Sequence, residues 1–295
     1  MIQELSHYCL RRIFKPQQYP LLSIESGIRL PVQKQGNRGH RLKICVIGAL
    51  AVLLLPPDSI YAQGIDDRIE GAPSAEFHFA RLVYDNATGS RRALRGWGNA
   101  WSTDYADAEY HLMQGVQRLI RLDAQAVDYD GVGGRLITLD NNRVFDYPWL
   151  YAVEVGQWHL NDTEAALLRE YLDRGGFLLV DDFWGDAEWQ VFMASMRRVF
   201  PDRAIVDLPD DHEIMHIHYD IKERTQIPGR RGPRQGLNPK WRAILDNDGR
   251  VVVAINFNMD MGDAWEHADD PSYPAAMTGL AYRFTMNYVV YSMTH

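Results

Sequence analysis

The sequence predicts an α/β protein whose mostly parallel sheet carries helices on both faces. Residues 149–155 are apolar and β-prone, as in a buried central strand, and residues 177–180 repeat this character. An amphipathic helix is expected between them, because Asn161-Asp162-Thr163-Glu164 forms a capping box and Gly175-Gly176 ends the helix. Strands that alternate with helices in this way favour parallel pairing under two helical layers.

The other elements before the C-terminal third follow from periodicity and turn residues. An alternating apolar pattern predicts an early strand at 76–84, and a polar loop follows at 85–103. Helical spacing predicts two further helices, and short β-prone runs predict two more strands: helices 105–122 and 186–200, and strands 135–139 and 203–208. The C-terminal third should contain a Pro- and Gly-rich loop at 225–239, a hairpin of 241–245 with 250–256, an acidic loop at 257–274, and a closing helix at 274–293.

Residues 1–62 are predicted to be an N-terminal extension with a secretory signal at Arg38–Ala62. Three basic residues precede an apolar run of roughly a dozen residues, Ile44–Leu55, which is shorter than a membrane span. We expect cleavage after Ala62 and a periplasmic or secreted location for a single α/β domain at 63–295. The alternative is an uncleaved signal that anchors the protein in the membrane.

Cysteine usage and charge exclude several classes of function for residues 63–295. Cys9 and Cys45 both precede the expected cleavage point, so the mature chain would have no thiol nucleophile, disulfide or thiolate metal site. Residues 63–295 hold 23 basic and 36 acidic residues, a net charge of −13. Such an acidic domain does not have the basic face that general nucleic-acid binding requires.

Several motifs, taken together and in order, resemble the bacterial domain-of-unknown-function 4159 family over roughly residues 77–295. They are Phe77–Tyr84, Asp146–Trp149, Tyr171–Gly176, Phe177–Asp182, Val199–Pro201 and Asn287–Tyr291. The resemblance implies a class I glutamine amidotransferase-like fold of the ThuA-like kind, with a flavodoxin-like sheet. It implies no agreed activity. Some relatives belong to larger membrane-anchored proteins near AAA-type ATPases and von Willebrand A domains, which suggests similar assembly partners.

The resemblance also indicates where chemistry would be located. In amidotransferases, the strand after the Gly-Gly helix stop leads into a tight elbow that carries Cys. Here the matching residues are Asp181-Asp182-Phe183-Trp184-Gly185, without Cys or Ser, so thiol amidotransfer by this route is excluded. Any reaction must use carboxylates, histidines or a metal.

The candidate catalytic residues are the carboxylates at predicted strand ends, where open α/β sheets bind ligands. Asp182 is interpreted as a general base or metal ligand, with Asp181 beside it and Glu154 as the second acid. Adjacent residues of a strand point to opposite sides, so only one aspartate should face a given cleft. The alternative is that one of them caps the next helix or binds N–H groups of a loop.

Two other segments are candidate binding sites. Trp97 and Trp101 could form a stacking platform for a sugar, or they could cover the end of the sheet as a small satellite core. The ligand-binding residues are predicted to be Asp85, Trp97, Asn99, Trp101, Trp184, Asn256 and Trp265. The histidine-rich segment could hold a metal or form a hydrogen-bonded loop, and its ligands would be His212, His216 and His218.

The late acidic segment has two interpretations, a solvated loop that could act as a lid and a calcium-binding loop. Its polar and aromatic residues are Asn256, Asn258, Asp260, Asp263, Trp265, Glu266, Asp269 and Asp270. The sequence requires no cofactor, but it could accommodate a divalent metal.

Two functional hypotheses follow from the sequence. The first is a non-enzymatic module of the cell envelope that holds a small molecule, a glycan or a protein partner in a degenerate amidotransferase-like cleft. The second is a carboxylate-dependent, metal-assisted hydrolase of an envelope carbohydrate or peptide. The missing nucleophile favours the first, and the acids at strand ends favour the second.

Overall fold

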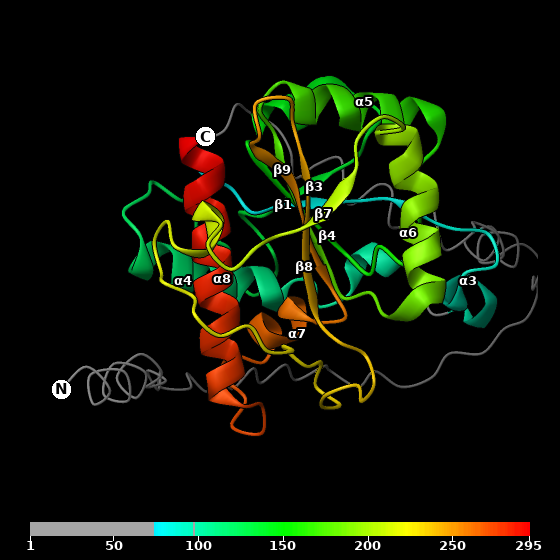
Figure 1. Cartoon of the computed structure of the whole chain (residues 1–295). Helices are drawn as coiled ribbons and strands as arrows, with labels where there is room; N and C mark the ends of the chain where they lie inside the picture. Colours follow the sequence, from blue (N-terminus) through cyan, green and yellow to red (C-terminus); the bar gives the residue numbers. More distant parts are fainter. Residues whose placement is uncertain (1–73, 97) are drawn as a thin grey trace, which may run out of the picture. The chain divides into compact units, whose positions relative to one another are not determined.

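The computed structural model describes residues 74–96 and 98–295 (Figure 1). The predicted signal segment, both cysteines and Trp97 lie outside these residues. Seven strands form the main sheet in the order β3-β1-β4-β6-β9-β8-β7. The strands span Ala80–Leu82 (β1), Arg135–Ile137 (β3), Trp149–Val153 (β4), Phe177–Asp181 (β6), Ile205–Asp207 (β7), Lys240–Leu245 (β8) and Val251–Phe257 (β9).

The α/β prediction is confirmed by the strand pairing. Strands β1, β3, β4, β6 and β9 pair in parallel, whereas β7 and β8 pair antiparallel at one edge. Numbered along the chain, the five parallel strands lie in the order 2-1-3-4-5, which is the order of flavodoxin-like sheets. Strand β3 is added on one side of β1, and the later strands β4, β6 and β9 are added on the other. Open α/β sheets bind ligands at such a switch point, beyond the carboxyl ends of the strands.

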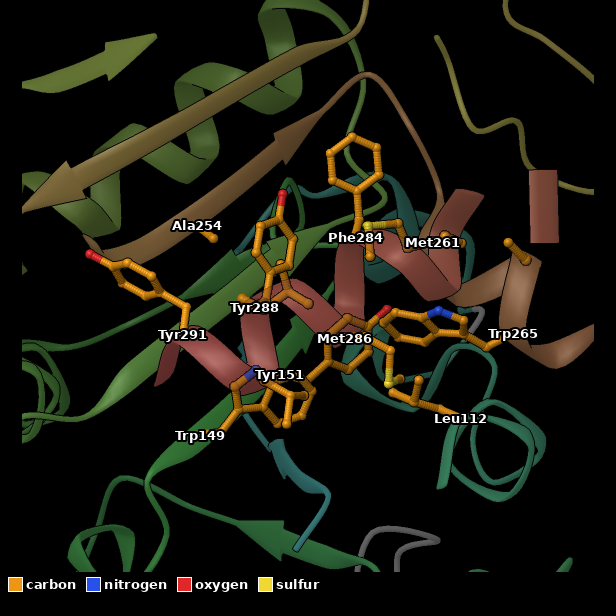
Figure 2. Packing of buried hydrophobic residues seen from close by; sticks show 14 of the residues in the cluster. Leu112, Trp149, Tyr151, Ala254, Met261, Trp265, Phe284, Met286, Tyr288 and Tyr291 are labelled. Atoms are coloured by element: carbon orange, nitrogen blue, oxygen red, sulfur yellow. The ribbon is translucent and has the colours of Figure 1, made fainter. Parts of the chain in front are cut away.

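Two helical layers cover the sheet, and alternate residues of each central strand face one layer or the other (Figure 1). Trp149 and Tyr151 of β4 belong to the core with α4, α7 and α8, whereas Leu150 and Ala152 belong to the core with α5 and α6. Figure 2 shows the first core, where Trp149 and Tyr151 lie beside side chains of α8. The helices are α4 (Asp107–Leu119), α5 (Asp162–Asp173), α6 (Gly185–Val199), α7 (Met261–Glu266) and α8 (Ala275–Thr294).

The predicted capping box of α5 is present. Asn161 Oδ1 accepts hydrogen bonds from the N–H groups of Thr163 and Glu164, and Glu164 Oε2 accepts one from Asn161 N at 2.8 Å. The helix ends before Gly175, whose φ of +108° few other residues adopt. The glycine stop at the end of α5 leads the chain directly into β6, which ends at Asp181 and is followed by Asp182.

Three sequence expectations were wrong in detail. The early strand is shorter than 76–84, because only Ala80–Leu82 pair with β3. The expected loops contain a short helix α3 (Arg91–Arg95) and a two-stranded ribbon of β2 (Asp85–Asn86) with β5 (Trp158–His159). The expected acidic loop contains α7, whose first turn is capped by the Asp260 side chain.

The remaining short elements are three single turns: η1 (Ala100–Ser102), η2 (Asn142–Asp146) and η3 (Glu213–Met215). Within the described residues, none of the helices has both the length and the apolar character needed to span a membrane. Helix α8 is long, but it packs into the core beside the sheet.

Candidate functional site: an acidic cluster at the carboxyl edge of the sheet

Three neighbouring parallel strands end in the same way. The residue directly after β4, β6 and β9 is a non-glycine residue in the left-handed region: Glu154 at φ 48°, Asp182 at φ 50° and Asn258 at φ 62°. Side chains with a Cβ rarely adopt this conformation, and it is found disproportionately at functional sites. The turn at Asp182 leads from β6 into α6 (Gly185–Val199).

The paired aspartates are both buried. Asp181 is 0% exposed and accepts a hydrogen bond from Met261 N at 2.6 Å, while Asp182 is 6% exposed and accepts one from the Trp184 indole at 2.7 Å. Charge repulsion from both carboxylates contributes to the raised pKa of Asp260. Asp182 adopts its left-handed conformation directly after the strand ends at Asp181.

Helix α7 and the segment before α4 bring three more carboxylates to this edge. Asp260 caps α7 by accepting a hydrogen bond from Asp263 N at 2.8 Å. Asp104, another left-handed residue, precedes α4. One carboxylate oxygen from each of Asp104, Asp260 and Asp263 lies within 4.8 Å of the other two. We call Asp104, Asp181, Asp182, Asp260 and Asp263 the acidic cluster.

Burial and mutual repulsion dominate the electrostatics of the acidic cluster. Burial, followed by repulsion from neighbouring carboxylates, raises the pKa values of Asp104, Asp182 and Asp260 well above the usual value for aspartate. Burial also raises the pKa of Asp181 to about 6, although hydrogen bonds from neighbouring groups, including the Met261 N–H, oppose the rise. A bound cation would offset both causes, since it favours the ionised form.

Two arginines support the acidic cluster from outside it. Arg81 is 0% exposed and pairs with Glu109, and it also donates to the carbonyl oxygens of Trp101 and Thr103 at 3.0 and 2.9 Å. These bonds fix the segment just before Asp104. Arg92 binds both carboxylate oxygens of Glu154, at 2.5 and 2.9 Å. Charge repulsion from Glu154 also raises the pKa of Asp182, although the Glu154 carboxylate is itself paired with Arg92.

The predicted catalytic carboxylates thus meet at one edge of the sheet, whereas most predicted ligand-binding residues do not join them. Asp85 and Asn99 are exposed and lie in the ribbon strand β2 and in the cap of η1. Trp101 is 7% exposed and belongs to the main core that includes residues of α5 and α6. Trp97 lies outside the described residues.

The other three predicted ligand-binding residues have structural partners. Trp265 is 0% exposed and packs against Tyr151, with ring centroids 5.2 Å apart. Asn256 is buried and accepts a hydrogen bond from the Tyr288 hydroxyl at 3.0 Å. Trp184 alone touches the acidic cluster, through the hydrogen bond of its indole to Asp182, and the Arg234 guanidinium stacks over its ring at 4.1 Å.

The histidine segment forms a hydrogen-bonded loop, as in the alternative interpretation. His212 Nδ1 accepts a hydrogen bond from Ile214 N, and the two ring nitrogens of His216 bind Asp220 Oδ1 and the Asp210 carbonyl, each at 2.7 Å. His218 packs edge-on against Tyr219. Among the described residues, two groups have potential metal-ligating atoms mutually within 4.8 Å, and they contain none of these histidines: Asp104, Asp260 and Asp263; and Asp263, Glu266 and His267.

Sequence reasoning identified the acidic segment after β9 but not Asp104. The segment was singled out by its density of acids, which includes Asp260, Asp263 and Glu266. Asp104 is one acid within a long polar loop, and its role depends on a left-handed backbone conformation and on the approach of α7. No local sequence pattern predicts either feature. The one weak signal is that Asp104 is an acid just before an amphipathic helix, where acids are favoured.

A family model described as a domain of unknown function (DUF4159) matches residues 78–293. The search of curated proteins found no significant match. The matched region includes every member of the acidic cluster.

Proposed function

Since the chain belongs to the DUF4159 family, as its motifs predicted, we propose a function from its site: an exported module of the cell envelope that binds its ligand through a divalent cation. The cation would occupy the acidic cluster, and the ligand would be a glycan that presents hydroxyl or carboxylate oxygens to it. The signal-like segment and the cysteine-free mature sequence support export. By family resemblance, AAA-type ATPases and von Willebrand A domain proteins are the proposed assembly partners.

One observation carries this proposal: the oxygens of Asp104, Asp260 and Asp263 lie within 4.8 Å of one another, with Asp260 buried and the other two residues half-buried. Like charges held this close destabilise the folded chain unless protons or a cation neutralise them. Carboxylate oxygens are the ligands that Ca²⁺, Mg²⁺ and Mn²⁺ prefer. A cation at this edge of the sheet also lies where open α/β sheets bind their ligands.

The test is calorimetric binding of an acidic cell-wall oligosaccharide to the full-length chain, with Ca²⁺ or Mn²⁺ and then with EDTA. We expect binding that EDTA removes, that Asp260→Asn abolishes, and that Asp269→Asn preserves. Asp269 is the matched control, because it is an exposed acid of the same segment outside the acidic cluster. Oligosaccharide binding that persists unchanged in EDTA would contradict the proposal.

The second candidate function is a metal-assisted hydrolase, and the position of Asp182 favours it. This carboxylate lies at the elbow after β6, next to the candidate cation ligands, with a pKa raised by burial and by Glu154. A carboxyl group with a raised pKa can exchange a proton with substrate near neutral pH. Release of reducing ends or amines from envelope carbohydrate or peptide, lost in Asp182→Asn while cation binding remains, would establish this function over simple binding.

A further inference from the structure

Asp263 belongs to both of the groups that could hold a cation in the described part of the chain. One group combines it with Asp104 and Asp260, and the other combines it with Glu266 and His267. The second group follows from the helix itself, because residues 263, 266 and 267 have the i, i+3 and i+4 spacing that places side chains on one face. The two groups therefore adjoin through a single carboxylate.

The two oxygens of Asp263 face different neighbours. A Cβ atom added to Gly229 would lie 2.9 Å from Asp260 Oδ2 and 3.0 Å from Asp263 Oδ2, so these two oxygens are close together. The other oxygen, Asp263 Oδ1, lies 3.8 Å from His267 Nε2, which is itself 3.2 Å from Glu266 Oε2. The carboxylate is thus oriented to give one oxygen to each group.

A buried polar atom without a partner in the first group points independently to a missing ligand. Asp104 Oδ2 is buried and has no hydrogen-bond partner, and a Cβ atom on Gly262 would lie 2.2 Å from it and 2.8 Å from the Tyr151 hydroxyl. Tyr151 is 0% exposed, and the partner of its hydroxyl is the carboxylate of Asp181, which is also 0% exposed. Figure 2 shows Tyr151 beside Trp265 of α7, the helix that carries Asp263.

A buried polar group without a partner is costly, so Asp104 Oδ2 calls for a compensating ligand. The Tyr151 hydroxyl, whose partner is the Asp181 carboxylate, lies close to this oxygen. A hydrated divalent cation would supply both positive charge and bound water to Asp104 Oδ2. This requirement exists whether or not the second group binds anything.

We infer that the edge of the sheet holds a two-cation centre in which the Asp263 carboxylate bridges the ions. Asp104 and Asp260 bind the first ion, and Glu266 and His267 bind the second. The inference rests on the proposed cation at the acidic cluster and extends it by a second ion and a bridging ligand. Paired ions bind and polarise anionic oxygens between them, so the ligand class is a carboxylate or phosphate group of an envelope molecule.

The ligand types predict different metal preferences for the two positions. The first position has only oxygen ligands and should accept Ca²⁺, Mg²⁺ or Mn²⁺. The second includes an imidazole, which suits first-row transition metals and not Ca²⁺. Mn²⁺ should therefore fill both positions, whereas Ca²⁺ should fill only the first.

The experiment is equilibrium dialysis of the EDTA-treated full-length chain against Mn²⁺ or Ca²⁺, followed by metal analysis. We expect two Mn²⁺ ions or one Ca²⁺ ion per chain. His267→Ala and Glu266→Gln should each lower Mn²⁺ to one ion and leave Ca²⁺ unchanged, and Asp263→Asn should weaken both positions. Asp269→Asn should still bind two Mn²⁺ ions, because its carboxylate belongs to neither group.

Failure of this inference can be distinguished from failure of the proposed function. One Mn²⁺ ion per wild-type chain, or two ions that persist in both His267→Ala and Glu266→Gln, would overturn the two-cation centre and leave the single-cation proposal standing. No bound cation of either kind would overturn both. Circular dichroism of each variant confirms that lost binding does not reflect unfolding.

Discussion

Asp260 and Asp263 are held side by side by the start of a short helix, because Asp260 Oδ1 accepts the hydrogen bond of Asp263 N at 2.8 Å. Capping normally satisfies a helix terminus and stabilises it by roughly 1 kcal/mol. Here the same bond also places two carboxylates next to each other beside the ends of β6 and β9. The stabilisation that the cap gives to the helix helps to offset the charge repulsion between the two carboxylates.

Replacing Asp104 by Asn should stabilise the metal-free protein and abolish its response to cations. The change removes one buried charge from a repelling group, so we expect the melting temperature in EDTA to rise by a few degrees, for a gain of roughly 1 kcal/mol. Saturating Mn²⁺ should then add much less stability than in the wild type. Asp269→Asn is the control and should respond to Mn²⁺ as the wild type does. A variant that melts lower in EDTA would contradict the repulsion argument.

The stability of the metal-free protein should fall as the pH rises. Burial raises the pKa of Asp181 from 3.8 to about 6 in the folded protein. The protonated carboxyl group therefore contributes its full stability below pH 4, and this contribution is lost as the pH rises through 6. Asp104, Asp182 and Asp260 shift in the same direction. Urea unfolding in EDTA between pH 4 and 8 measures this trend.

Saturating Mn²⁺ should reduce the same pH dependence, because the ion favours the charged carboxylates. The expected loss for Asp181 alone is about 3 kcal/mol, from 1.36 kcal/mol for each pH unit between 3.8 and about 6. Asp181→Asn should remove its share of the slope in EDTA. Stability that increases from pH 4 to 7 in EDTA would show that the carboxylates are not repelling one another in the folded chain.

The buried pair of Arg81 and Glu109 should be essential to the integrity of the site. Replacing Arg81 by Met leaves a charged Glu109 that is 1% exposed, and such uncompensated charges cost roughly 3–5 kcal/mol. The double replacement Arg81→Met with Glu109→Leu should lose much less, since both charges are removed together. Urea unfolding of the three proteins measures the difference, and equal losses in the single and double variants would contradict it.

Gly262→Ala should weaken cation binding without a large loss of helix stability. A Cβ at this position would lie 2.2 Å from Asp104 Oδ2, so the carboxylate must move away from its partners. Gly279 of α8 is the matched control, because a Cβ there meets nothing within 4 Å. Gly279→Ala should stabilise the chain by roughly 0.5–1 kcal/mol and leave Mn²⁺ affinity unchanged. Equal Mn²⁺ affinity in Gly262→Ala and the wild type would contradict the geometry.

Much of the fold could be predicted because its signals are local. A pattern of only a few residues predicts each of these features: the capping box at Asn161, the Gly-Gly stop, and the apolar strands 149–153 and 177–181. The parallel order follows from their alternation with helices. The helix α7 was missed because it is six residues long and lies in an acidic, glycine-containing segment, where propensity favours a loop.

The site was predicted in part, and the division has a physical origin. Asp181, Asp182 and Glu154 could be identified because the ends of parallel strands meet at one edge. Asp104 depends on a long-range approach of α7, which local sequence does not encode. Trp101 was assigned to a ligand as part of a stacking platform, but Trp101 and Trp265 are almost fully buried and belong to the two cores. Asn256 is buried as well and accepts a hydrogen bond from Tyr288.

The most direct test of the account is the melting temperature of the EDTA-treated full-length chain, measured before and after addition of Mn²⁺ at about 100 times its dissociation constant. Binding to the folded state alone should stabilise it by about 2.7 kcal/mol, which raises the melting temperature by roughly 5–10 °C. Asp260→Asn should not show this rise. A wild-type melting temperature that Mn²⁺ and Ca²⁺ both leave unchanged would contradict the claim that the acidic cluster is a cation site.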